Sequence, residues 1–292
     1  MAVTATAISS RTNTRVKQLR AAFTGHDRLS GGLVAIEGEH LLEEALRSGI
    51  VPRIVFLTEE QEAPAALPHT VEIVRLTSDV FASAVETRSP QGIAALIQPP
   101  EYTLANALES QASPLIVIAV GLQDPGNLGT IVRSAEAFGA SGVLVTPGTV
   151  SPWNQKALRA SVGSIFRIPV VSATRDEIAH LQTGHGIRLF AAVGTAPTRV
   201  LAAHDADLRH PSALLIGNEG AGLALEWLAL ASTQITIPCP GPVESLNAAV
   251  AASLLLYEAS RQRTPSTPPA AKALPEPRIP GPLRRRPTGA NR

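Results

Sequence analysis

The sequence predicts an α/β protein made of two successive domains, and three observations carry this prediction. Segments typical of strands and helices alternate over residues 11–99 and again over residues 114–263. The stretch QPPEYTLANALESQASP carries prolines and weak apolar periodicity, so residues 100–113 are expected to form a linker with one short helix. The second series opens with the fully apolar run LIVIAVG, which is typical of a strand buried on both faces of a parallel sheet.

The first domain is expected to be a small α/β unit that follows a flexible segment, residues 1–10. Its strands are predicted at residues 33–38, 53–58, 71–76 and 92–98, and its helices at residues 12–23, 39–49 and 78–86. The first helix is basic, because cations recur at roughly helical spacing: Arg11, Arg15, Lys17 and Arg20. Such a face could follow RNA phosphates, although a basic helix that simply faces solvent is at least as common.

The second domain is expected to contain six strands, each followed by a helical or turn segment. They are predicted at residues 115–121, 142–147, 167–171, 188–194, 213–217 and 234–238. The last helix, AAVAASLLLYE, is apolar nearly all round and should be buried, with a second copy of the chain as one candidate for its cover. Residues 264–292 are rich in proline and carry Arg284, Arg285 and Arg286, so they are expected to be a disordered tail or a weak RNA-contacting arm.

Charge, residue counts and the lengths of the apolar runs limit the kinds of site and location expected for this protein. Lys and Arg number 25 against 24 Asp and Glu, so any nucleic acid must be bound by a local basic patch. The single cysteine, Cys239, excludes an internal disulfide, and the seven histidines show no metal-ligand spacing, so no metal is expected. The N-terminus lacks a signal-peptide core and the apolar runs are shorter than a membrane span. The sequence therefore predicts a soluble cytoplasmic protein without a membrane partner.

The loop GLQDPGNLGTIVRSAEAFGA follows the first buried strand, where open parallel sheets bind ligands. A turn at residues 124–127 leads into a helix with an apolar stripe, and Arg133 lies off that stripe. Asn127 and Arg133 are therefore candidate functional residues. The alternative is a helix that is N-capped by Asn127 and carries a solvent-facing arginine.

Two later loops have the same design. In LLIGNEGAGL, closely spaced glycines allow a backbone to approach a ligand, and Glu219 is the only charge. Its spacing is not G-x-G-x-x-G, so a dinucleotide-dependent oxidoreductase is disfavoured. In ITIPCPGPVESLNAAV, Ser245 could N-cap the final helix, whereas Asn247, two residues into a buried helix, needs hydrogen-bond partners.

In order and spacing, these three segments resemble the motifs of the SpoU (TrmH-like) branch of the SPOUT RNA methyltransferases. The resemblance covers about residues 115–261. The stretches SSRTNTRVKQLRAAF and LVAIEGEHLLEEALRSG also resemble the substrate-binding domain that often precedes this catalytic domain and is similar to ribosomal protein L30e. One departure is Cys239, where the family usually has methionine; we expect local packing to change and activity to survive.

The resemblance implies a deep trefoil knot that binds S-adenosylmethionine, and a homodimer whose active site is completed across the interface. It places a set of residues at the cofactor: Val193, Gly194, Thr195, Ile216, Gly217, Asn218, Gly220, Ile237, Pro238, Ser245, Leu246 and Asn247. Main-chain groups of Gly217, Ile237 and Leu246 would contact the adenine and ribose.

The implied reaction is methyl transfer to a ribose 2′-hydroxyl of RNA, with ribosomal RNA preferred and transfer RNA possible. The implied catalytic residues are Asn127, Arg133, Glu219, Ser245 and Asn247. The resemblance makes Arg133 the general base, but a guanidinium stays protonated in proteins. It could instead bind the adjacent phosphate and stabilise the developing alkoxide. A base-modifying enzyme and a non-catalytic RNA-binding module of the same fold remain alternatives.

Overall fold

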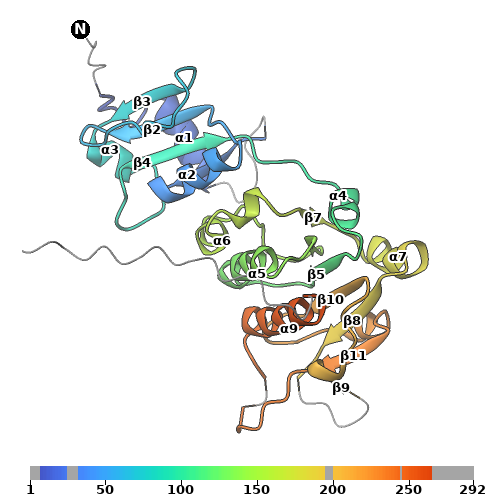
Figure 1. Ribbon diagram of the computed structural model, residues 1–292. Coiled ribbons are helices and arrows are strands. Elements are labelled where there is room, and N and C mark those ends of the chain that lie inside the picture. Colours follow the sequence, from blue (N-terminus) through green and yellow to red (C-terminus); the bar gives the residue numbers. More distant parts are fainter. Residues whose placement is uncertain (1–6, 25–31, 195–199, 244, 265–292) are drawn as a thin grey trace, which may run out of the picture.

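The computed structural model describes residues 7–24, 32–194, 200–243 and 245–264. Figure 1 shows two β-sheets, one near each end of the described chain, connected through the short helix α4 (Leu104–Glu109). This helix was predicted within the linker. The predicted tail, residues 265–292, and the predicted cofactor residue Thr195 lie outside the described residues.

The N-terminal sheet has four strands in the order β1-β4-β2-β3. Their bounds are Val34–Glu37 for β1, Ile54–Thr58 for β2, Glu72–Leu76 for β3 and Ile93–Ile97 for β4. β4 is antiparallel to both neighbours, and β3 is parallel to β2. The helices are α1 (Thr14–Thr24), α2 (Glu39–Arg47) and α3 (Ser78–Ala82). The side chains of α2 pack on one face, and those of α1 and α3 pack on the other.

Two details of this domain differ from the predictions. Helix α3 ends at Ala82, four residues earlier than predicted. Part of the predicted flexible N-terminus is hydrogen-bonded: the Ile8 amide donates to Arg75 O (2.9 Å), and Ile8 O accepts from the Thr77 amide (3.1 Å). β3 is an edge strand with unpaired backbone groups, and the segment around Ile8 satisfies some of them.

The second sheet has seven strands in the order β7-β6-β5-β10-β8-β11-β9, and every pair is parallel. Their bounds are Leu115–Ala119 for β5, Gly142–Val145 for β6, Val170–Ser172 for β7, Arg188–Ala192 for β8, Leu201–Ala202 for β9, Ser212–Ile216 for β10 and Thr233–Thr236 for β11. The predicted α/β class with a mainly parallel C-terminal sheet is confirmed. The sequence missed β9, because two residues are too few to show a periodicity.

Helices cover both faces of this sheet, which is why β5 is buried along its whole length. One face packs against α5 (Pro125–Ala137), α6 (Gln155–Ser161) and α9 (Ala248–Arg263). The other packs against α4, α7 (Arg175–His185) and α8 (Leu225–Leu228). Two 3-10 turns, η1 (Ser164–Phe166) and η2 (Ala203–Asp205), complete the domain. Within the described ranges, no helix is long and apolar enough to cross a membrane.

Within a single chain, helix α9 is buried on one side only, and the cover predicted for its other side is not part of this chain. Val250, Leu254 and Tyr257 are 48%, 43% and 55% exposed. Their i, i+4, i+7 spacing places them along one side of the helix, opposite the side that packs on the sheet. The single chain therefore leaves one apolar stripe of α9 uncovered.

The two domains share one continuous apolar cluster, which includes side chains of α2, α6 and η1. A buried polar contact crosses the same boundary: Gln155 Nε2 donates to Ala35 O at 2.8 Å. β1 is an edge strand of its sheet, so α6 covers an edge that would otherwise be open.

Candidate functional site

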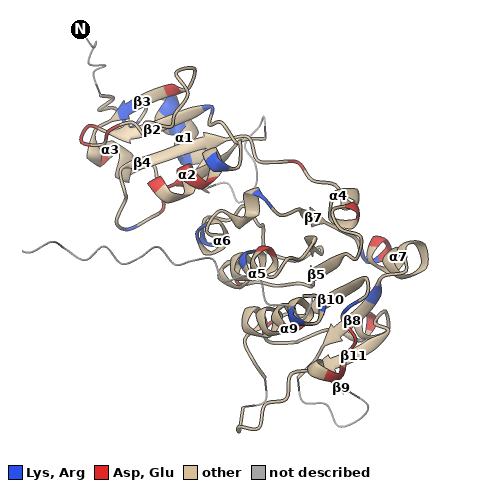
Figure 2. Ribbon diagram, in the orientation of Figure 1, with Lys and Arg blue, Asp and Glu red and all other residues tan. Residues whose placement is uncertain are grey.

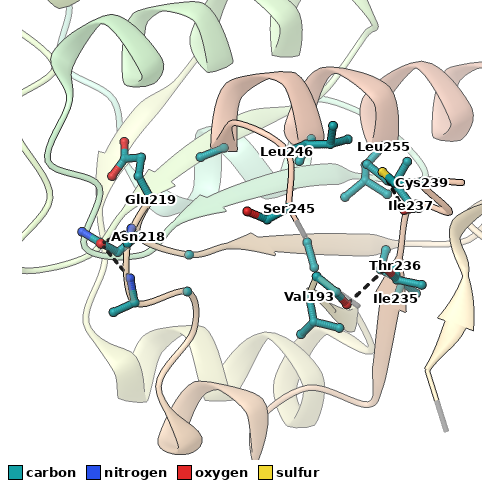
Figure 3. A pocket seen from close by; sticks show the side chains of 18 residues that line it. Val193, Asn218, Glu219, Ile235, Thr236, Ile237, Cys239, Ser245, Leu246 and Leu255 are labelled. Carbon is teal, nitrogen blue, oxygen red and sulfur yellow. Dashed lines mark hydrogen bonds between the residues drawn. The ribbon is translucent and has the colours of Figure 1, made fainter. Parts of the chain in front are cut away.

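A cavity of about 270 Å³ lies where β8, β10 and β11 end. These strands are neighbours and parallel, so the loops that leave their carboxyl ends meet at one edge of the sheet. Figure 3 shows Asn218 and Glu219 on one side of the cavity, Leu246, Leu255 and Ile237 on the other, and Ser245 between them. The cavity therefore has a polar side and an apolar side.

The glycine loop after β10 is tightly folded. A Cβ at Gly217 would lie 2.5 Å from the carbonyl carbon of Gly222, so only glycine fits there. Asn218 Nδ2 donates to Gly121 O (2.9 Å), and its Oδ1 accepts from the Gly220 amide (2.9 Å) and the Ala221 amide (3.3 Å). The side chain of Asn218 thus holds the loop in shape and attaches it to the loop after β5.

Replacing Gly217 with alanine should weaken binding of S-adenosylmethionine, the cofactor that the sequence resemblance implies, by roughly tenfold and lower the Tm. An added methyl group there must displace backbone, and overpacking of this kind costs about 1–3 kcal/mol. Calorimetric titration with S-adenosylmethionine and a thermal melt would measure both effects. Gly241→Ala is the matched control, since a Cβ at Gly241 meets no atom within 4 Å. Wild-type affinity in Gly217→Ala would contradict the expectation.

Three side chains form a hydrogen-bonded chain beside the cavity. Asn127 Nδ2 donates to Glu219 Oε1 (2.8 Å), and Asn247 Nδ2 donates to Asn127 Oδ1 (3.0 Å). Asn247 Oδ1 in turn accepts from the amides of Ala249 (2.9 Å) and Val250 (3.2 Å) at the start of α9. Because a carboxylate only accepts and a helix N-terminus only donates, the two ends fix how both amides are turned. We call this set the Glu219–Asn127–Asn247 chain.

The N-caps of helices α9 and α5 differ from those considered in the sequence. Helix α9 begins at Ala248 with Asn247 as its N-cap, so Asn247 is not inside the helix and Ser245 is not the cap. Helix α5 is capped by Asp124, which accepts from the Asn127 amide at 2.9 Å, rather than by Asn127. Asp124 followed by Pro125 is a strong helix-start pattern, from which this cap could have been predicted. The side chain of Asn127 is thereby free to join Glu219 and Asn247.

The environment of Glu219 favours its charged form. Burial alone would raise the pKa of this carboxyl, but the hydrogen bond from Asn127 and those from backbone amides outweigh it and hold the pKa below its ordinary value. Because the pKa is lowered in the folded state, the ionised carboxylate stabilises the folded protein at neutral pH. This stabilisation is lost as the pH falls through that pKa. The hydrogen bonds of the Glu219–Asn127–Asn247 chain should therefore be intact at neutral pH.

Eight predicted cofactor residues line the cavity: Val193, Gly194, Gly217, Asn218, Gly220, Ile237, Ser245 and Leu246. Three others do not: Ile216 is buried in β10, Pro238 is outside the lining, and Asn247 belongs to the hydrogen-bonded chain. Several further lining residues were not predicted from the sequence as cofactor residues: Ala192, Ala221, Gly222, Ile235, Thr236, Cys239, Ala248, Ala251 and Leu255. Most are small or apolar, so they look like core residues in a sequence. Cys239 could have been found, since it departs from the family pattern at this loop.

Comparison with known proteins identifies the family. Residues 114–257 match the SpoU rRNA Methylase family, and residues 13–95 match the MRM3-like substrate binding domain. The 23S rRNA (guanosine(2553)-2′-O)-methyltransferase RlmP of Bacillus subtilis is 35% identical over 250 residues, which cover 86% of this chain and 97% of that protein. The chain belongs to the SpoU family.

Solved SpoU structures have the same overall fold. The SpoU methyltransferase AviRb from Streptomyces viridochromogenes, in complex with the cofactor AdoMet, has a TM-score of 0.75 at 29% identity, covering 86% of this chain and 98% of AviRb. The AdoMet-bound rRNA methyltransferase from Sinorhizobium meliloti has a TM-score of 0.78 at 28% identity, covering 89% of this chain and 99% of that one. The resemblance seen in the sequence is confirmed.

One predicted catalytic residue of this SpoU chain does not line the cavity. Arg133 is exposed on α5, is not among the lining residues, and has no hydrogen bond or ion pair with the described part of the chain. The helix itself reaches the site through Asn127 near its first turn. A single chain therefore assembles Asn127, Glu219, Ser245 and Asn247 but not Arg133.

The predicted RNA-binding cations are mostly engaged within the N-terminal domain. Arg11 precedes α1 and pairs with Asp79 (3.5 Å), Arg15 makes two bonds to Glu72 (2.7 and 3.0 Å), and Arg20 donates to Ser83 O (3.2 Å). Figure 2 shows the basic segments of α1 next to the acidic end of β3. Lys17 is exposed and has no partner among the residues described. The described ranges also hold no group of three His, Cys, Asp or Glu that could bind a metal.

Proposed function

We propose that this protein transfers a methyl group from S-adenosylmethionine to a ribose 2′-hydroxyl of ribosomal RNA. The observation that carries the proposal is the cavity at the ends of β8, β10 and β11 with the Glu219–Asn127–Asn247 chain beside it. A cavity with one apolar and one polar side suits a ligand that joins a flat base to charged groups. Family membership and the AdoMet-bound relatives support the choice of cofactor.

The protein's task in this reaction is to align an oxygen and to stabilise developing charge. The cofactor, when bound, would supply an activated methyl group. Alignment of the ribose 2′-hydroxyl with that methyl group would therefore account for much of the rate enhancement. Asn127 is held by Glu219 and Asn247, and Ser245 faces the cavity, so these groups orient the ribose. The guanidinium of Arg133 binds the neighbouring phosphate and stabilises the alkoxide as the proton leaves to water.

Arg133 reaches the site from a second copy of the chain, and the protein acts as a homodimer. Helices α5 and α9 pack side by side, joined by the hydroxyl contact between Ser134 and Ser253 (2.7 Å). The exposed stripe of α9 and the exposed Arg133 of α5 therefore belong to neighbouring elements. A two-fold interface over this stripe would bury apolar surface and bring Arg133 toward the partner's cavity.

We assign roles to the other parts of the chain as well. Residues 11–99 bind structured RNA. Arg15 can exchange its exposed partner Glu72 for an RNA phosphate, because an exposed ion pair contributes little to stability. Residues 114–263 form the catalytic domain with the trefoil knot that the resemblance implies, and residues 100–113 connect the two. The enzyme works in the cytoplasm, in keeping with its single cysteine.

A methyl-transfer assay with labelled cofactor tests the proposal. Purified protein is incubated with unmodified ribosomal RNA and, separately, transfer RNA, and the nucleosides are then identified by mass. We expect label in one 2′-O-methyl nucleoside of ribosomal RNA and none with Arg133→Ala. Arg175→Ala is the matched control, because Arg175 is an exposed arginine at the start of α7, follows the edge strand β7, does not line the cavity and has no partner among the described residues.

Other outcomes of the same assay select the alternatives. Label on a base would keep the fold and cofactor but exclude ribose chemistry, and label in transfer RNA alone would change the substrate. Cofactor binding without transfer to either RNA would support a non-catalytic RNA-binding module. Unchanged activity of Arg133→Ala would remove Arg133 from the site.

A further inference from the structure

Arg167, which directly follows η1, joins the two domains through three elements. Its Nε and Nη2 donate to the two carboxylate oxygens of Glu136 on α5 (2.5 and 3.0 Å). Its Nη1 donates to Glu44 Oε2 on α2 at 2.6 Å. The paired fork on Glu136 is the strongest geometry available to an arginine and a carboxylate. Nothing in the reaction described above uses this cluster.

The local backbone is built to bring Glu44 to Arg167. Between α6 and η1 the chain takes two left-handed residues, Val162 (φ 50) and Gly163 (φ 83), and a β-branched residue rarely adopts that conformation. A Cβ at Gly163 would lie 2.5 Å from Glu44 Cβ, so glycine is what lets α2 approach. Glu44 also accepts from Arg47 at 2.7 Å. The strained turn thus fixes the N-terminal domain against the end of α5.

Glu136 lies three residues after Arg133 on α5. Residues three apart on a helix are neighbours, so the carboxylate of Glu136 is within reach of the Arg133 guanidinium. In the structure both oxygens of Glu136 are instead taken by Arg167, and Arg133 has no partner among the residues described. Burial alone would raise the pKa of Glu136, but Arg167 and, to a smaller extent, a hydrogen bond from Ser164 hold it below its ordinary value, so the carboxylate is charged and would compete for any free cation nearby.

We propose that Arg167 is a positioning residue that keeps Glu136 away from Arg133, so that Arg133 is available to the RNA phosphate and the reacting oxygen. This inference rests on the proposed function of Arg133. Because Glu44 is the second partner of Arg167, docking of the substrate-binding domain and availability of Arg133 are linked through one guanidinium. Loss of Arg167 releases a carboxylate that pairs with Arg133 and repels the incoming phosphate.

Replacing Arg167 with alanine should lower the single-turnover rate of methyl transfer and raise the KM for RNA, each by roughly three- to tenfold, with the affinity for S-adenosylmethionine unchanged. The decisive variant is Arg167→Ala with Glu136→Gln, which removes the competing charge and should restore most of the rate. Glu136→Gln alone should be close to wild type. Arg209→Ala is the matched control, because it deletes another exposed, ion-paired arginine (Arg209 to Asp207, 2.9 Å).

The outcomes separate this inference from the proposed function. If Arg167 served only to dock the domains, Glu44→Gln would reproduce the defect and Glu136→Gln would not rescue it, which overturns the inference. If Arg133→Ala abolishes transfer while Arg167→Ala is normal, the inference alone fails. If Arg133→Ala is itself fully active, the role proposed for Arg133 fails first.

Discussion

Replacing Asn127 with aspartate should reduce methyl transfer by about 10²–10³-fold, the loss typical when one oriented donor is removed from an active site. The substitution hardly changes the shape of the side chain. It exchanges the amide that donates to Glu219 Oε1 at 2.8 Å for a second carboxylate at the same distance. Two carboxylates so close cannot both be ionised without a large penalty, so they repel each other or share a proton.

The pH dependence of this variant gives a second test. A shared proton raises the pKa of the pair in the folded state, so its stabilising contribution is present at acid pH and is lost as the pH rises through the raised pKa. In the wild type, the pH dependence of stability due to Glu219 has the opposite sign, because the pKa of Glu219 is lowered in the folded state. The Tm of Asn127→Asp relative to wild type should therefore fall from acid to neutral pH, as thermal melts would show.

Asn154→Asp is the matched control, because Asn154 N-caps α6 by accepting from the Lys156 amide (2.9 Å) and aspartate is an equally good cap. It should leave rate and Tm nearly unchanged. Full activity of Asn127→Asp at neutral pH would show that the donor role of Asn127 is not needed for the reaction.

Replacing Leu254 with aspartate should yield monomers and remove nearly all methyl transfer. Leu254 is the central residue of the exposed stripe on α9, and a charge there must be desolvated for the proposed two-fold interface to form. The isolated chain lacks Arg133 at its cavity, so dissociation should cost the reaction as much as deleting that arginine. Sedimentation analysis and single-turnover assays would measure the two effects.

Leu225→Asp is the control for this prediction, since Leu225 is 83% exposed on α8, away from the stripe. It should leave the oligomeric state unchanged. Mixing Arg133→Ala chains with Asn127→Asp chains adds a positive test, because a mixed dimer holds one complete site, which neither homodimer has. A fully active Leu254→Asp monomer, or no recovery on mixing, would contradict an active site completed across the interface.

Much of this protein could be predicted from its sequence. Strand and helix periodicity predicted every strand of the N-terminal sheet and all of the second except β9, because each buried strand needs an uninterrupted or alternating apolar run. The spacing of the three glycine- and asparagine-bearing loops predicted the family, and parallel strands place such loops at one edge. Those patterns involve residues that are close together in the sequence, so they can be read from the sequence directly.

The tertiary structure alone decided what the polar side chains do. Asn127, Glu219 and Asn247 are far apart in the chain, and only the neighbouring positions of β5 and β10 and the start of α9 bring them into hydrogen-bond contact. The same is true of Arg15, for which the sequence predicts an RNA contact and whose guanidinium pairs with Glu72 of β3 in the structure. A hydrogen bond is directional and acts over about 3 Å, so partners of this kind are fixed by packing between elements and leave no periodicity in the sequence.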